Sequence, residues 1–476
     1  MTYKDFQIPN KRVLERKIGL ADSVFLVIGA VFGSGIFLTT GVIAARLPSP
    51  GLIWLMWIAG GILTIMGALT YAELGALYPE SGGPYIYLRE AFGDATAFVF
   101  GWTFFWIISG GGVAALAMGF AEYAGSLVPP LSAARALVSV DLFGGTFVVH
   151  PGHLVAVASI LLLTALNATG IRTGVRFQSI MTIGRLAALA LFIVLGFVAA
   201  VRLAGADNLN PFFPRGAWPA LPQFGAAFLA VIWTYDGWYA VSCTAEEVRS
   251  PSRTIPLSLV LGTAAVLVLY LAANIVYSMA LSVNEMSGVI RIGSQASQVL
   301  FGPSAAALFT GFIAVSILGC LSANILFCPR VAFAMSRDGL FFGSLARIHP
   351  RFGVPSLAIA AQGAWAALLC FTGTYGALIE FVAFALVLFF AATGIALFVL
   401  RRKAMDRPRP YRTWGYPVVP AVFILATLAI FAAVVAARPG AAAIGLALIL
   451  SGLPAFAFWK RLRRAPVPAA DPRGRG

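Results

Sequence analysis

The sequence predicts an all-α integral membrane protein with twelve spans, built as a five-plus-five inverted repeat followed by two extra helices. Of the 476 residues, 60% are hydrophobic and only 11% are charged, and the mean hydropathy is +0.90. Soluble domains carry about a quarter charged residues, so folding in water is excluded. Long apolar runs recur along the chain, and two of them are interrupted at corresponding places by residues that disfavour a helix.

Apolar runs of about 19 residues or more predict the membrane-spanning helices. Only "GIRTGVRF" separates the fourth run from the fifth. The predicted spans cover residues 20–45, 51–78, 95–127, 152–171, 176–203, 223–247, 256–281, 303–335, 354–373, 376–401, 416–437 and 440–460. They divide the chain into an N-terminal segment (1–19), a first repeat (20–203), a second repeat (223–402), a final helix pair (416–460) and a basic tail (461–476).

Basic residues are distributed unevenly among the predicted loops. The net charge is +15, with 33 lysines and arginines. If the N-terminus lies inside, the loops on the outer side contain only Arg46, Arg135, Arg202, Arg215, Arg291 and Arg438. The positive-inside rule therefore predicts a multi-pass inner-membrane protein with both termini in the cytoplasm. The charge is explained by topology, so no nucleic-acid partner is expected.

Cysteine and histidine positions argue against a disulfide, a metal site or an enzyme. The four cysteines, Cys243, Cys320, Cys328 and Cys370, lie in or at the ends of spans, so no disulfide-linked accessory subunit is expected. The three histidines fall at loops or span ends without metal-ligand spacing. No embedded nucleophile and base are paired in the sequence. We expect no metal, no cofactor and no enzymatic activity, and the oligomeric state is left open.

The first interrupted span contains "VIGAVFGSGIF". Two glycines around Ser34 weaken a helix by about 1 kcal/mol each relative to alanine. Unwinding at Gly33-Ser34-Gly35 would free backbone N–H groups at the start of the following half-helix, where the helix dipole favours an anion. The alternative is close helix packing, because Gly29 and Gly33 form a GxxxG pattern. The two interpretations are compatible if Gly29 packs against another helix while residues 33–35 bind the anion.

The second interrupted span reads "WTYDGWYAVSC", with Asp236 beside Gly237 at its centre. An acid at midmembrane costs several kcal/mol on insertion scales. The two interrupted spans are five apart, as expected for an inverted repeat whose first helices are both broken. No residue-level repeat is evident between the halves, so this inference rests on the spacing and on the two weak points. Free amides at one break and carbonyls at the other would together receive an amino-acid zwitterion.

Five motifs in order resemble the amino acid–polyamine–organocation (APC) transporters, and among them the bacterial amino-acid permeases related to the L-type transporters. The resemblance extends from about Arg16 to Pro420. The motifs are "GAVFGSGIF", "YAELGALYPESGGPYIYLREAFG", "WTYDGWYAVSCTAEEVRSPSRTIPLSL", "CPRVAFAMSRDGLFF" and "RPRPYRTWGYPVVP". The resemblance implies a LeuT-like fold with discontinuous helices 1 and 6, and with spans eleven and twelve outside the repeat core.

Site residues are carried over from this resemblance by position. The substrate carboxylate is expected at the amides of Val31, Ser34 and Gly35, with Gly33 permitting the break. The amino group is expected near the backbone of Trp233, Tyr235 and Asp236, with Gly237 at the break. Relatives place an aromatic gate at the position of Trp233, where the larger indole here would reduce the room for bulky side chains. The alternative for Trp233 is an interfacial aromatic facing lipid.

Asp236 and Arg185 have open roles. Asp236 either reads the substrate ammonium or holds the unwound segment in shape, and the structural role is slightly favoured. Many relatives carry a lysine at Arg185, where sodium-coupled cousins bind Na⁺. Arginine effectively keeps its proton, so an inward-pointing Arg185 would be a fixed cation that disfavours both proton and Na⁺ coupling. The alternative is that Arg185 extends towards the cytoplasmic interface.

The sequence therefore predicts a secondary transporter for small or medium neutral L-amino acids, working in the lipid bilayer by alternating access as an exchanger or uniporter without Na⁺. Alternatives are a cationic amino-acid or polyamine antiporter, a proton-coupled symporter and a transporter-like amino-acid sensor. On the cytoplasmic side, Glu246 and Glu247 are expected to pair with arginines of an inner gate. The turn "SGGP" should precede an amphipathic helix that contains Arg89.

Overall fold

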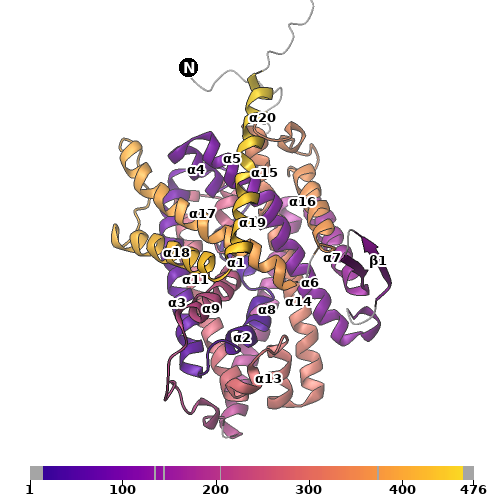
Figure 1. The fold of residues 1–476 in the computed structure, drawn as a ribbon. Coiled ribbons are helices and arrows are strands. Elements are labelled where there is room, and N and C mark those ends of the chain that lie inside the picture. Colours follow the sequence, from indigo (N-terminus) through magenta and orange to yellow (C-terminus); the bar gives the residue numbers. More distant parts are fainter. Residues whose placement is uncertain (1–13, 133–135, 143–144, 204, 373–374, 465–476) are drawn as a thin grey trace, which may run out of the picture.

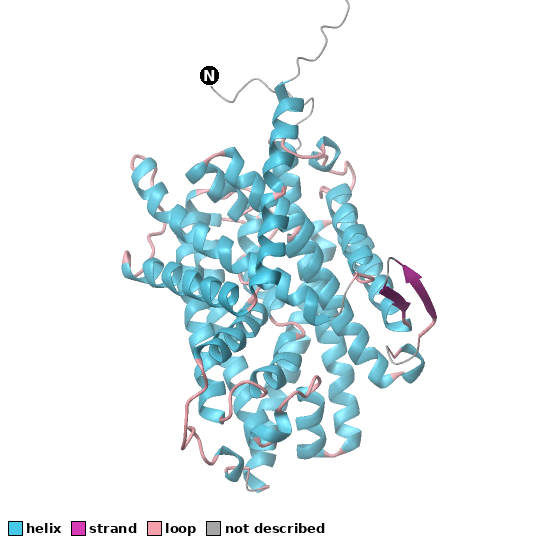
Figure 2. Cartoon of the chain, viewed as in Figure 1, coloured by secondary structure: helices cyan, strands magenta, loops and turns pink. Residues whose placement is uncertain are grey.

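The computed structural model describes residues 14–132, 136–142, 145–203, 205–372 and 375–464. This part of the chain is a bundle of helices, with a single two-stranded hairpin at its edge (Figures 1 and 2). Much of the predicted N-terminal segment (1–19) and of the basic tail (461–476) lies outside the described residues.

The helices and strands follow the chain in this order. They are α1 (Leu20–Val31), α2 (Gly35–Ala44), α3 (Pro50–Leu77), α4 (Pro84–Phe92), α5 (Asp94–Thr103), a π-helical segment (Phe104–Ser109), α6 (Gly110–Leu127), β1 (Val138–Leu142), β2 (Gly145–Val149), α7 (Pro151–Ala168), α8 (Ile171–Arg202), α9 (Leu221–Tyr235), α10 (Ala240–Cys243), α11 (Pro251–Ala280), α12 (Val283–Met286), α13 (Ile292–Phe301), α14 (Pro303–Phe327), α15 (Pro329–Arg337), α16 (Ser356–Leu369), α17 (Tyr375–Lys403), α18 (Val418–Ala437), α19 (Pro439–Leu450) and α20 (Gly452–Arg464).

Proline marks the start of many helices. Pro50, Pro151, Pro251, Pro303 and Pro439 each occupy the first turn of a long apolar helix. Proline lacks the N–H that is unpaired in a first helical turn, and its fixed φ suits that position. The sequence therefore sets these helix starts locally, before any packing is considered.

Ten segments of the described chain are long and apolar enough to cross a membrane, and two further apolar helices are shorter. The shorter ones are Leu221–Tyr235 and Ser356–Leu369, which correspond to the predicted sixth and ninth spans. The sixth is short because its helix ends at Asp236-Gly237, where the backbone becomes extended. A multi-pass helical membrane protein with ten candidate spans among the described residues is thus confirmed.

The interior is formed where α1 packs against α8, α11 and α14, while α6 packs along α14. The helices α11 and α3 pair closely, and α18 lies against α17 at the side of the bundle (Figure 1). The antiparallel hairpin pairs Val138 with Val149 and Leu142 with Gly145. This hairpin was not predicted from the sequence. The breaks of the first and sixth spans meet in the interior, and they position the site.

Candidate substrate-binding site

The first break separates α1 from α2 at residues 32–34. Phe32 ends α1 with ψ near 81°, and Ser34 caps α2. The backbone N–H of Gly33 donates to the carbonyl of Val31 at 2.8 Å, so it does not continue the hydrogen-bond pattern of the helix. A Cβ on Gly33 would lie 2.6 Å from Cys320 Sγ, so only glycine lets α14 approach this closely. The break is therefore built by glycine at a point of tight interhelical contact.

At the start of α2, the amides of Gly35 and Ile36 donate no backbone hydrogen bond to any described residue. The first N–H groups of a helix have no partner within that helix, and they carry the positive end of its dipole. Val31, Gly33, Ser34 and Gly35 all line the adjoining pocket. The residues predicted to hold the substrate carboxylate thus lie together at one end of this pocket.

The second break ends α9 at Tyr235. Asp236 is extended, with φ −62° and ψ 156°, and Gly237 has φ +95°. A Cβ on Gly237 would lie 2.8 Å from the carbonyl oxygen of Ala30, so the two breaks touch. The hydroxyl of Tyr270 bridges them, because it lies 2.9 Å from Val31 O and 3.3 Å from Thr234 O. The two unwound segments, two hundred residues apart in sequence, form one structural unit.

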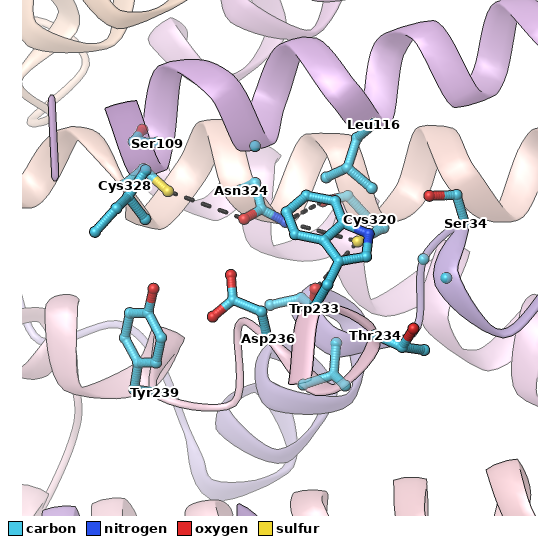
Figure 3. A pocket seen from close by; sticks show the side chains of 16 residues that line it. Ser34, Ser109, Leu116, Trp233, Thr234, Asp236, Tyr239, Cys320, Asn324 and Cys328 are labelled. Atoms are coloured by element: carbon cyan, nitrogen blue, oxygen red, sulfur yellow. Dashed lines mark hydrogen bonds between the residues drawn. The ribbon is translucent and has the colours of Figure 1, made fainter. Parts of the chain in front are cut away.

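A small pocket lies between the breaks (Figure 3). Its free volume is about 30 Å³, which holds water but not an amino acid, so a substrate has to widen it. Six of the eight predicted binding residues line it: Val31, Gly33, Ser34, Gly35, Trp233 and Asp236. Tyr235 and Gly237 do not. The hydroxyl of Tyr235 turns away and donates to the carbonyl of Trp57 at 3.2 Å, while Gly237 packs on Ala30.

Asp236 and Ser34 occupy opposite ends of the pocket in Figure 3, with the Trp233 indole between them. Trp233 is 7% exposed, so it belongs to the interior and does not face lipid. The carboxylate of Asp236 points towards Tyr239 (Figure 3). Its Oδ1 atom is buried and has no hydrogen-bond partner among the described residues. An acceptor of this kind can receive a donor from a ligand.

Sequence reasoning missed the pocket wall made by α14 and α6. Cys320 and Asn324 on α14, and Cys328 directly after it, recur every four residues and so lie on one side of the pocket. The Cys320 thiol donates to Ala30 O at 3.1 Å. From the π-helical segment and α6 come Ile108, Ser109, Gly112 and Leu116. The recurrence of polar residues every four positions was the sequence signal from which this wall could have been suspected.

Arg185 is 2% exposed and lies inside the bundle on α8. Its Nη1 donates to Phe32 O at 2.9 Å and to Ser316 O at 3.3 Å, and its Nη2 donates to Thr182 Oγ1 at 2.8 Å. The guanidinium therefore joins the first break to α8 and α14. A Cβ on Gly29 would meet this same polar group, so Gly29 packs against α8 while Gly33 lines the pocket.

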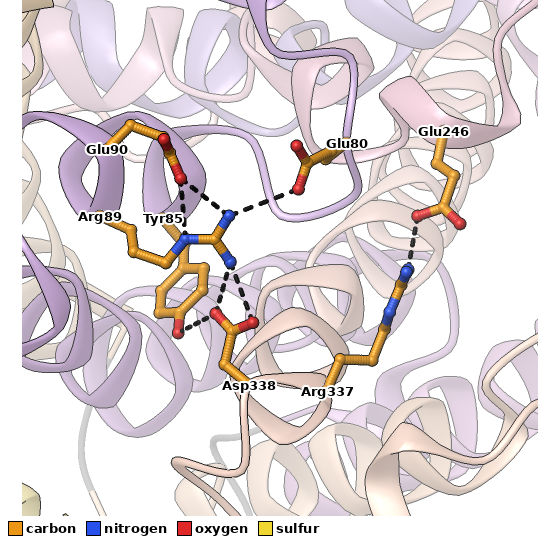
Figure 4. A network of polar contacts seen from close by, with 7 residues as sticks. All are labelled: Glu80, Tyr85, Arg89, Glu90, Glu246, Arg337 and Asp338. Carbon is orange, nitrogen blue, oxygen red and sulfur yellow. Dashed lines mark hydrogen bonds and ion pairs between the residues drawn. The ribbon is translucent and has the colours of Figure 1, made fainter. Parts of the chain in front are cut away.

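Ion pairs close the molecule at the face that carries α4 and α15. Glu247 pairs with Arg330, and both side chains are 1% exposed. Beside them, Arg337 pairs with Glu246, and Arg89 contacts both carboxylate oxygens of Asp338 at 2.9 and 2.7 Å (Figure 4). The predicted pairing of Glu246 and Glu247 with arginines is confirmed.

Asp338 also accepts a hydrogen bond from a second residue of the predicted amphipathic helix. The Tyr85 hydroxyl donates to Asp338 at 2.8 Å (Figure 4). Burial opposes the charged state of Arg89, but the Asp338 carboxylate outweighs it and raises the pKa of the guanidinium above its ordinary value. Arg89 is therefore a permanent cation that holds α4 to the end of α15.

Membrane-crossing helices and two facing helix breaks that share a small pocket define a class of membrane transporters. Comparison with known proteins identifies the family. The model of the amino acid permease family matches residues 18–453, so the chain belongs to this family.

Individual relatives agree over nearly the full chain. It is 30% identical over 458 residues to the serine/threonine exchanger SteT of Bacillus subtilis, covering 94% of this chain and 98% of that protein. It is 30% identical to the mouse Asc-type amino acid transporter 1 over 467 residues, and 31% identical to the mouse large neutral amino acids transporter small subunit 2 over 464 residues. Each match covers 94% of this chain and 82% of the relative. The prediction of an amino-acid transporter rather than an enzyme is confirmed.

Proposed function

We propose that this protein moves small or medium neutral L-amino acids by alternating access, as an exchanger or uniporter without Na⁺ coupling. The observation that carries the proposal is the convergence of both breaks on one pocket. One end offers the first amides of α2, and the other offers the Asp236 carboxylate. Those two ends match the carboxylate and the ammonium of a zwitterion.

Substrate binding begins at the α2 end of the pocket. The substrate carboxylate is held by Val31, Ser34 and Gly35, with Gly33 keeping the approach open. The ammonium lies at the end of α9, near Trp233 and Asp236. Tyr235 and Gly237 act indirectly, since they shape the second break without lining the pocket.

A small substrate requires the least widening of the pocket. The free volume of about 30 Å³ and the Trp233 indole restrict bulky side chains. The name of one relative specifies serine and threonine. Serine and threonine are therefore the first substrates to test on this chain.

Arg185 serves as a fixed cation at the break, in the position where sodium-coupled cousins bind Na⁺. Its contacts with Phe32 O and Ser316 O support this role, because a metal ion there would use the same kind of carbonyl ligand. Arginine does not release its proton in this setting, so coupling to protons through this residue is disfavoured.

The fold is a LeuT-like five-plus-five repeat, with residues 20–203 and 223–402 as the repeats and 416–460 as the added pair. The protein lies in the inner membrane of the cell, and both of its termini are in the cytoplasm. Three features support this layout: the position of the two breaks, the short sixth and ninth helices, and the bias of basic residues.

A cationic amino-acid or polyamine antiporter is the second candidate. The unpartnered Oδ1 of Asp236 favours it, since a buried carboxylate acceptor would bind a second positive charge. Competition for uptake by arginine or putrescine separates the two. If either compound competes as well as serine does, Asp236 reads the substrate side chain.

The test is uptake of labelled serine, leucine and arginine into proteoliposomes, with and without internal amino acid and at two pH values. We expect serine uptake that depends on internal substrate and ignores pH in the wild type. Arg185→Lys should gain pH dependence, because lysine can lose its proton when desolvated. Proton-driven uptake by the wild type would contradict the fixed-cation role, and binding without flux would indicate a sensor.

A further inference from the structure

Residues 401–412, from the last turn of α17 into the connection to α18, include six basic residues. Lys403 donates to Ala91 O at 2.7 Å, and the five arginines fall into two sets. The first set faces inward: Arg401 and Arg409 both contact Glu73, whose side chain is fully buried on α3. The backbone N–H of Thr413 also donates to Glu73, at 2.6 Å. One buried carboxylate therefore fixes both ends of the connection against the bundle.

The second set faces outward. Arg402, Arg407 and Arg412 are exposed, and the only acid within residues 401–417 is Asp406. Arg402 and Arg412 make no hydrogen bond or ion pair with the described residues, and Arg407 lies over the ring of Tyr78 at 4.6 Å. Glu73 is already engaged by the inward arginines, so it cannot neutralise the outward ones.

Large apolar side chains stand exposed beside these cations. Trp414 is 78% exposed, Met405 is 75% exposed, and Val418 at the start of α18 is 65% exposed. The connection lies at the outer edge of the molecule, between the ends of two membrane-crossing helices (Figure 1). Tryptophan is favoured at the membrane–water interface, where its ring is buried among headgroups and its N–H stays hydrated.

We propose that Arg402, Met405, Arg407, Arg412 and Trp414 form a binding surface for the headgroup of an anionic phospholipid. Arginine forks bind phosphate oxygens in pairs, and cations near an anionic leaflet are attracted to it. The positive-inside bias alone would explain the basic residues. It does not explain why an exposed indole lies beside them, on a connection that a buried acid holds in place. The Glu73 contacts keep the cations spread towards the lipid.

The test uses full-length protein in nanodiscs of mixed phosphatidylcholine and phosphatidylglycerol. Native mass spectrometry gives the ratio of retained phosphatidylglycerol to phosphatidylcholine. Each interfacial cation is worth about fivefold in binding to an anionic surface. Arg402→Gln/Arg412→Gln removes two such cations and should therefore lower the ratio by up to about 25-fold. The matched control, Arg347→Gln/Arg351→Gln, removes two exposed cations from the connection between α15 and α16, and it should leave the ratio unchanged.

Fluorescence locates the site. The emission of Trp414 is the part of the fluorescence that is lost in Trp414→Phe. Brominated phosphatidylglycerol should quench this emission more strongly than brominated phosphatidylcholine does. Arg402→Gln/Arg412→Gln should abolish the difference between the two lipids. The proposal is overturned if both double variants lower the lipid ratio equally, or if the two brominated lipids quench Trp414 alike. Displacement of the lipid by glycerol phosphate in solution would indicate a soluble phosphate site and would also overturn it. Neither readout involves transport, so the result is independent of the proposed function.

Discussion

Ion pairs lie at both faces of the bundle, but they differ in how deeply they are buried. At the face with α4 and α15, the Glu247–Arg330 pair is 1% exposed on both sides, and the backbones at Ile18 and Val248 are bridged. At the face with α13, Arg291 reaches Glu122 by a single 3.5 Å contact, and each side chain is 41% exposed.

This difference predicts which face opens more readily. An exposed ion pair exchanges its partner for water at little cost, whereas separating a buried pair strands charges in a poorly hydrated interior. The α13 face does have one buried contact, since the Tyr123 hydroxyl donates to Phe37 O at 2.9 Å. Even so, the resting protein should remain closed at the α4 and α15 face. With the proposed topology, that is the cytoplasmic face.

The largest expected effect follows from breaking the buried pair. Glu247→Gln leaves Arg330 without its charge partner, which should lower the free energy of unfolding by about 3–5 kcal/mol. Thermal unfolding in detergent measures it. The double variant Glu247→Gln/Arg330→Met should recover part of the loss, because no stranded charge remains. A single variant as stable as the wild type would remove the contrast between the faces.

An intermediate effect is expected at Asp338. This carboxylate is 12% exposed and accepts from Arg89 and Tyr85. Asp338→Asn should lower the free energy of unfolding by about 1–3 kcal/mol, because it weakens a charged and largely buried hydrogen-bonded group. Tyr85→Phe, which removes one neutral donor, is the control and should cost less when measured in the same thermal assay. The reverse order would show that the tyrosine, rather than the ion pair, holds α4.

The smallest effect is expected at the α13 face. Glu122→Gln and Arg291→Gln should each change the unfolding free energy by no more than about 1 kcal/mol. Raising the salt concentration should shrink even that difference, since exposed charges are screened. Thermal unfolding of both variants at low and high salt checks this. A loss as large as that of Glu247→Gln would show that both faces are sealed alike.

The sequence predicted the breaks well because their chemistry is local. Gly33-Ser34-Gly35 and Asp236-Gly237 disfavour a helix wherever they stand, and the structure breaks α1 and α9 there. Their meeting at one pocket was inferred from their spacing along the chain and from these two weak points. The details of the second break were not predictable, since the direction in which Tyr235 points depends on Trp57 across the bundle.

The wall formed by α14 and α6 could not be assigned from sequence. Cys320, Asn324 and Cys328 share a face, but a small polar stripe on an apolar helix is equally typical of close packing. Only the neighbouring helices decide whether such a stripe meets a cavity. The β1–β2 hairpin escaped prediction because no pattern in the apolar spans bears on the length or pairing of a loop.

The central claim is that the pocket between the breaks binds the substrate, and the native thiols test it directly. Cys320 and Cys328 line the pocket, whereas Cys370 is buried elsewhere, at the end of α16. The measurement is the rate at which a small thiol reagent modifies each of these three cysteines, read by mass spectrometry with and without saturating serine. Serine should slow modification of Cys320 and Cys328 several-fold and leave Cys370 unaffected. If a transported amino acid protects neither pocket cysteine, or protects all three equally, the substrate does not bind between the breaks.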